Sequence, residues 1–198
     1  GWTLAYQMGV QFDRIMDGFE GPFEKNPLGQ IIKLTSTVVK NSTNGYVLDA
    51  RINQSYKAVN NLINSGVDVY RINNTNTESA YSNGSFFIAA GAKAKSTIDK
   101  IVTENNVQFI AVDQKPTALS KIKKARIALW DTYGGSMPSG WVRLILEKFN
   151  YAFDVIYPKD IDTGNLISKY DVIVFVGGAI PAVGAAANTG FGFNNPNP

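Results

Sequence analysis

The chain has 198 residues, a net charge of +3 and 44% hydrophobic residues, a balance typical of one globular domain or a domain with an arm. It contains neither Cys nor His. These two absences exclude disulfides, thiol nucleophiles, Cys/His zinc sites and every Ser-His or Cys-His dyad within this chain. Residue chemistry alone therefore indicates a folded α/β module and names no reaction.

The small excess of positive charge gathers in one cluster, which consists of Lys121, Lys123, Lys124 and Arg126. The cluster has no interleaved aromatic residues and is narrower than the basic face that a nucleic acid needs. We therefore interpret it as a solvated loop and expect no nucleic-acid partner. No apolar run approaches the ~20 residues of a membrane span, so we expect no membrane span either.

Residues 1–44 predict an irregular arm, because glycines and prolines interrupt its aromatic residues. A short strand at Gln30–Lys40 is the only regular element expected there. The aromatic residues are Trp2, Tyr6, Phe12, Phe19 and Phe23. We expect the arm to pack these rings on a neighbouring domain, and a sugar- or peptide-binding platform is the alternative.

Three strand–helix–strand stretches follow in the chain. The expected strands are Tyr46–Ala50, Val67–Ile72, Ser85–Ala89, Val107–Val112, Arg126–Trp130, Phe153–Tyr157 and Asp171–Val176. The first two helices begin near Asn53, as N-cap, and near Ala92. The third helix has the apolar spacing of a buried face, formed by Trp141, Val142, Ile145, Leu146 and Phe149. A short helical or turn segment is expected near Asp160.

Strands this apolar, alternating with helices, predict an α/β fold with three layers, in which a mostly parallel sheet has helices on both faces. The domain would span residues 45–181, either as one unit or as two sub-units, 45–120 and 121–181. Residues 182–198 lack periodicity and are expected to form a loop or disordered tail. We expect the chain to be cut within a domain at this point.

The best candidate site is the loop Asp131–Gly140, between a predicted strand and helix. Ligands collect at the carboxyl ends of strands in open α/β sheets, and two glycines allow a close backbone approach. The simpler interpretation is a tight turn with a capping serine, since no phosphate-binding motif is present. A glycine pair after the last strand is a second, weaker candidate. The candidate ligand-binding residues are Asp131, Tyr133, Gly134, Gly135, Ser136, Ser139, Gly177 and Gly178.

Three carboxylates, Asp49, Asp113 and Asp131, each follow a predicted strand. In neighbouring parallel strands they would converge on one sheet edge, where they could bind Mg²⁺ or Ca²⁺. Separate turn and capping roles are the alternative, and we favour these, so that no metal site and no catalytic residue is assigned to this chain.

Several phrases of the sequence resemble large bacterial M14-type zinc carboxypeptidase-like proteins, in a region downstream of their catalytic domain. The phrases are Gly1–Val10, Phe12–Ile15, Gly18–Phe23, Arg126–Trp141, Phe153–Ile161 and Tyr170–Pro181. The resemblance is strong at the two ends of the chain and loose in the middle.

The resemblance implies an accessory, non-catalytic part of a secreted protein whose own activity is the removal of C-terminal residues. The implied fold is flavodoxin-like, of the class I glutamine amidotransferase type, without that family's Cys and His. Zinc is expected only in the parent's peptidase domain. The implied partners are that domain and peptide substrate, and the implied location is periplasmic or extracellular.

Two other hypotheses stay open. The first is a flavodoxin-like module that binds a small anion, a peptide terminus or a sugar at Asp131–Gly140. The second is a His-free enzyme that uses Asp, Tyr, Ser and Lys at the sheet edge.

Overall fold

A computed structural model describes residues 4–8, 11–25, 27–29, 39–73, 81–105, 107–177 and 179. The chain divides between Ile122 and Lys123 into two compact units. Both units mix helices and strands, so the α/β class predicted from the sequence is confirmed. The parallel sheet predicted for the whole of 45–181 is only partly confirmed, because the two units contain different kinds of sheet.

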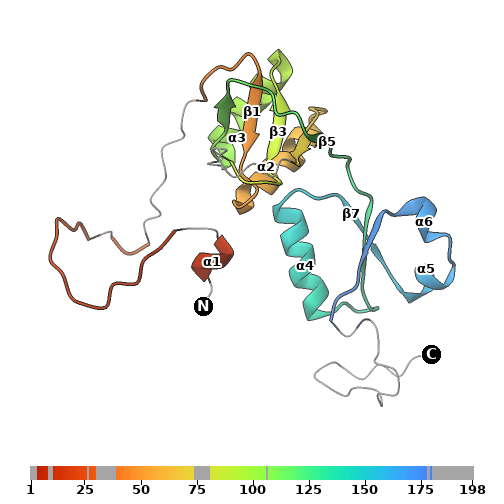
Figure 1. The fold of residues 1–198 in the computed structure, drawn as a ribbon. Helices are drawn as coiled ribbons and strands as arrows, with labels where there is room; N and C mark the ends of the chain where they lie inside the picture. Colours follow the sequence, from red (N-terminus) through yellow and green to blue (C-terminus); the bar gives the residue numbers. More distant parts are fainter. Residues whose placement is uncertain are drawn as a thin grey trace. The chain divides into compact units, whose positions relative to one another are not determined.

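The first unit holds five strands and three helices among its described residues (Figure 1). They are α1 (Leu4–Met8), β1 (Gly45–Leu48), α2 (Asn53–Asn64), β2 (Tyr70–Ile72), β3 (Phe86–Ala89), α3 (Ala92–Asn105), β4 (Ile110–Val112) and β5 (Leu119–Lys121). The sequence analysis did not predict β5 or α1. The strand predicted at Gln30–Lys40 falls almost wholly outside the described residues. The α2 N-cap is Ile52, one residue before the predicted cap.

The sheet of the first unit is antiparallel, which corrects the prediction of parallel strands for this part of the chain. Its strand order is β4-β1-β3-β2-β5, and every adjacent pair runs antiparallel. Strand β3 lies between β1 and β2, so each β–α–β crossover is split by a strand of the other crossover. From β1 to β4 this is the split β–α–β topology of ferredoxin-like folds, with β5 added at one edge.

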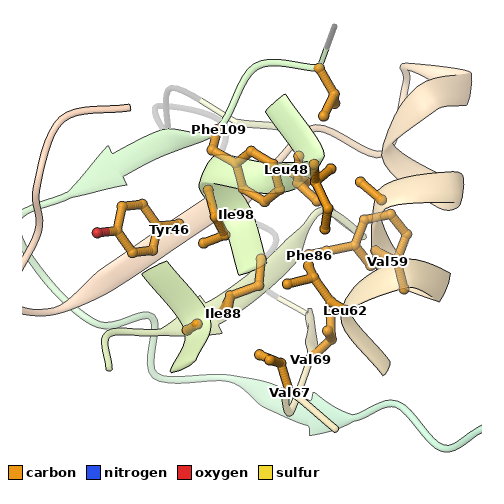
Figure 2. Close-up of a cluster of buried hydrophobic side chains, with 14 of the residues drawn as sticks. Tyr46, Leu48, Val59, Leu62, Val67, Val69, Phe86, Ile88, Ile98 and Phe109 are labelled. Carbon is orange, nitrogen blue, oxygen red and sulfur yellow. The ribbon is translucent and has the colours of Figure 1, made fainter. Parts of the chain in front are cut away.

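The central strands β1 and β3 are buried on both faces, which explains why these two strands are apolar. Tyr46, Leu48, Phe86 and Ile88 face α2 and α3 and pack with buried residues of those helices (Figure 2). On the opposite face, Val47, Ile72 and Phe87 form a second buried cluster. Apolar strands buried on both faces are typical of parallel sheets but do not require them, because the periodicity of a strand reports only burial and not the direction of its neighbours.

The second unit holds three strands and three helices among its described residues. They are β6 (Ile127–Trp130), α4 (Met137–Lys148), β7 (Phe153–Ile156), α5 (Pro158–Asp162), α6 (Leu166–Lys169) and β8 (Val172–Val174). The strand order is β7-β6-β8, and both pairs are parallel, as predicted. Helix α4 lies on one side of these strands, and α5 and α6 lie on the other (Figure 1).

The apolar face predicted for α4 is not buried as a whole. Trp141 is 64% exposed and Ile145 is 56% exposed, and Met137 and Leu144 on the same side of the helix are also exposed. The helix turns its other side, with Ser139 and Leu146, toward the unit's interior. Helix α4 is apolar around most of its circumference, so the spacing of the apolar residues could not show which side the sheet covers.

Candidate functional site

The loop after β6 begins with a buried carboxylate. Asp131 is 1% exposed, and its main-chain N–H continues the pairing with β7 by donating to Ile156 O at 2.9 Å. An Asp in this position needs compensation, because an ionised carboxylate loses its hydration on burial. Two donors supply it: Thr132 N donates to Oδ1 at 2.8 Å, and Arg143 Nη2 donates to Oδ2 at 2.6 Å.

The N-terminus of helix α4 ends the loop, and the helix also supplies the counter-ion of Asp131. Ser136 is the N-cap, and its Oγ accepts from Ser139 N at 3.3 Å, while Pro138 occupies the first turn. Ser139 and Arg143 stand one helical turn apart on the inward side of α4. The Ser139 hydroxyl is fully buried near the Asp131 carboxylate, although it does not meet it in hydrogen-bonding geometry.

The charge of Asp131 is stabilised despite its burial. Burial would raise the pKa of this carboxyl group, but the neighbouring Ser139 hydroxyl, the Thr132 N–H, the Ser136 hydroxyl and the Arg143 charge together lower it below its ordinary value. The carboxylate is therefore ionised at neutral pH and already paired. This arrangement suits an anchor that holds the loop to the helix rather than a proton-transfer group.

The middle of the loop is a tight turn with open surroundings. Gly135 N donates to Thr132 O at 2.9 Å, and Gly134 and Gly135 both have positive φ, at +88° and +80°. In the described structure a Cβ at either glycine would meet no atom within 4 Å. The glycines are thus required by the backbone conformation and not by a close neighbour.

Tyr133 forms the outer part of the site. Its ring stacks on that of Tyr157, with centroids 4.7 Å apart and an interplanar angle of 5°. Tyr157 follows β7, so the contact joins two neighbouring loops at the carboxyl edge of the parallel sheet. Sequence reasoning found Tyr133 but missed Tyr157 and Arg143. The spacing of Arg143 from the inward-facing Ser139 was the one available signal.

The chain after β8 reaches the same edge of the sheet with Gly177. Because Leu129 is paired with Val174 in parallel register, the residues that follow β6 and β8 leave the sheet side by side. Gly177 is exposed there, and Gly178 lies outside the described residues. The structure thus brings the loop 131–140 and Gly177 to one edge.

Asp49, Asp113 and Asp131 do not converge on one sheet edge, which was the less favoured of the two interpretations of their positions in the sequence. Strands β1 and β4 are antiparallel, so Asp49 and Asp113 lie at opposite ends of them, and Asp131 belongs to the other unit. Asp49 is engaged by Arg51 and by Ser82 Oγ at 2.9 Å, which lowers its pKa to about 2, chiefly through the Arg51 hydrogen bond. The described residues contain no group of three or more acidic side chains that could hold a metal ion.

In comparisons with known proteins, no family model, curated protein or solved structure matches the chain. Within the part of the chain that the structure describes, no helix is long and apolar enough to cross a membrane.

Proposed function

We propose that the chain is a non-catalytic accessory domain of a secreted M14-type zinc carboxypeptidase-like protein, and that it supports the peptidase domain by docking on it. The resemblance of Arg126–Trp141 and Tyr170–Pro181 supports the parentage. The absence of His and Cys from the sequence supports a role that assists hydrolysis and does not perform it.

The observation that carries the docking proposal is the apolar surface of residues 12–23. Five large side chains are exposed within this short stretch, which has no regular secondary structure. They are Phe12 (48%), Ile15 (63%), Met16 (73%), Phe19 (60%) and Phe23 (67%). Exposed apolar groups at this density mark an interaction surface, and aromatic side chains supply most of the energy of such contacts.

Calorimetric titration of the chain into the peptidase domain of the parent tests this function. We expect saturable binding that the double change Phe19→Ser and Phe23→Ser weakens by about 2 kcal/mol or more, roughly 30-fold, since the two rings pack edge to face and act together. The control is Ile167→Ser, which removes a side chain that is 88% exposed on α6. Equal affinity of the double variant and the control would rule out docking by the arm.

A second function, small-ligand binding, is favoured by the loop 131–140. The strand order β7-β6-β8 is that of the first three strands of a flavodoxin-like sheet, whose ligands bind where the strand order reverses, between β6 and β8. A thermal-shift screen with anions, short peptides and sugars tests it. A ligand at 100 times its Kd adds about 2.7 kcal/mol of stability. If none of the three ligand classes raises the unfolding temperature, this function is excluded.

A further inference from the structure

The stacked tyrosines at the carboxyl edge of the parallel sheet have the construction of a ring-binding platform. Tyr133 is 62% exposed although one face of its ring lies against Tyr157, so the other face is open to solvent. Tyr157 is half-buried and acts as the support under the exposed ring. Aromatic faces carry a negative quadrupole charge, which attracts polarised C–H groups and planar rings.

Both rings are held in place from their own loops. On the Tyr133 side, Gly135 N donates a hydrogen bond to Thr132 O across the turn, and Thr132 N donates to the Asp131 carboxylate. On the Tyr157 side, Tyr157 N donates to Asp160 Oδ2 at 2.8 Å, and Asp160 N donates back to Tyr157 O at 2.9 Å. A ligand that stacks here orders little of the protein, so little binding free energy is lost.

The charges around the platform favour a neutral ligand. The loop 131–140 contains no Lys or Arg. The guanidinium of Arg143 is paired with Asp131, and beside Tyr157 the negative charge of Asp160 is offset by the positive charge of the exposed Lys159. A phosphate or carboxylate would therefore meet no cation within the loop 131–140 and no net positive charge beside Tyr157, whereas a neutral ring needs no counter-charge.

The open space beside the ring favours a ligand edged with hydroxyl groups. A Cβ at Gly134 or Gly135 would have no described atom within 4 Å, so a ligand can lie against this stretch of main chain. Sugar hydroxyl groups both donate and accept, and can pair with the main-chain N–H and C=O groups of this stretch. Polarised C–H groups on one face of a pyranose complement the face of the Tyr133 ring.

We propose that Tyr133, supported by Tyr157, stacks on the C–H face of a neutral pyranose sugar, whose hydroxyl groups bond along Gly134 and Gly135. This inference rests on the ligand-binding function proposed for the loop 131–140. It is separate from the docking proposed for residues 12–23.

Saturation-transfer NMR on the full chain tests the proposal with neutral tetrasaccharides of glucose, xylose, mannose, galactose and N-acetylglucosamine, and with adenosine as a planar competitor. We expect at least one sugar to bind. Tyr133→Ala should weaken that binding about tenfold, because the stacking face is lost. Tyr133→Phe should keep it within about twofold, because the ring remains.

The matched control is Tyr6→Ala, since Tyr6 is also a well-exposed tyrosine at 73% and lies in the other unit. The control should bind the sugar as the unaltered chain does. Binding by none of the sugars, equal binding by Tyr133→Ala, or tighter binding of adenosine would each overturn the proposal. If the sugars fail while a peptide or anion raises the unfolding temperature, the ligand-binding function survives and only the sugar is wrong.

Discussion

The two units have the same local pattern of strand, helix and strand but arrange it in different kinds of sheet. In the first unit two crossovers interleave into an antiparallel sheet, and residues such as Leu62, Phe87 and Ile98 are completely buried. In the second unit the crossovers lie side by side in a parallel sheet, and Trp141 and Ile145 remain largely exposed. Between Gly45 and Ile122 the first unit buries most of its large apolar side chains in its own fold, whereas the second unit leaves many of them exposed and available for contacts.

The largest effect should come from the core of the first unit. Leu62→Ala removes a fully buried side chain between α2 and the sheet, and we expect the free energy of unfolding to fall by about 3 kcal/mol. Trp141→Ala removes a larger side chain from the second unit but should change stability by only about 0.5 kcal/mol, because most of that surface is already solvated. Urea denaturation followed by circular dichroism measures both, and a larger loss for Trp141→Ala would break the comparison.

The next effect concerns the single buried ion pair described in the second unit. Asp131→Asn keeps the size of the side chain but leaves Arg143 without its counter-ion, and we expect a loss of about 2 kcal/mol, since Arg143 is 35% exposed and partly hydrated. The control is Asp171→Asn, which breaks the exposed pair with Arg126 and should cost less. Equal losses in urea denaturation would show that Asp131 does not anchor the loop.

The presence and approximate position of most helices and strands could be predicted because they depend on local signals. The apolar run Phe86–Ile88 marked β3, and two possible capping serines, Ser136 and Ser139, on either side of Pro138 marked the start of α4, where the structure has Ser136 as the cap. Strand β5 was missed because it is short, lies at a sheet edge and has one apolar residue, Leu119.

Strand direction in the first unit could not be predicted, because it depends on which distant strand fills the gap between β1 and β2. The same limit applies to the site. Turn chemistry identified Asp131 and the two glycines after Tyr133. The partners Arg143 and Tyr157 belong to other elements, and only the folded chain brings them to the loop.

A substitution in α4 should raise the free energy of unfolding, by less than the preceding substitutions lower it. Gly140 lies within the helix with ordinary backbone angles, and a Cβ there would meet no described atom within 4 Å. Gly140→Ala should therefore stabilise the second unit by about 0.5 to 1 kcal/mol, through helix propensity and a less flexible unfolded chain. Gly134→Ala is the contrasting variant, because φ is +88° there and the substitution should destabilise. Thermal unfolding distinguishes the two, and destabilisation by Gly140→Ala would contradict the open position of that glycine.

The smallest effect is a dependence of the free energy of unfolding on pH, which we expect in both units. Hydrogen bonds from Arg51 and Arg126 lower the pKa values of Asp49 and Asp171, respectively, from 3.8 to about 2. Because the folded pKa is the lower one, each pair stabilises the fold above pH 3.8, and this contribution is lost as the pH falls toward 2. Urea midpoints measured across this range should fall less steeply in Asp49→Asn and Asp171→Asn. An unchanged slope in both variants would show that neither pair persists in solution.

The central claim, that this chain assists a peptidase and does not itself cut, is tested most directly by an activity measurement. The purified chain is incubated with zinc and a peptide substrate, and released C-terminal residues are quantified by mass spectrometry. The account predicts no release above the protein-free blank and no stoichiometric zinc in the chain, since it has no His or Cys to form a zinc site of this kind. Zinc-dependent release that increases with the concentration of the chain would contradict it.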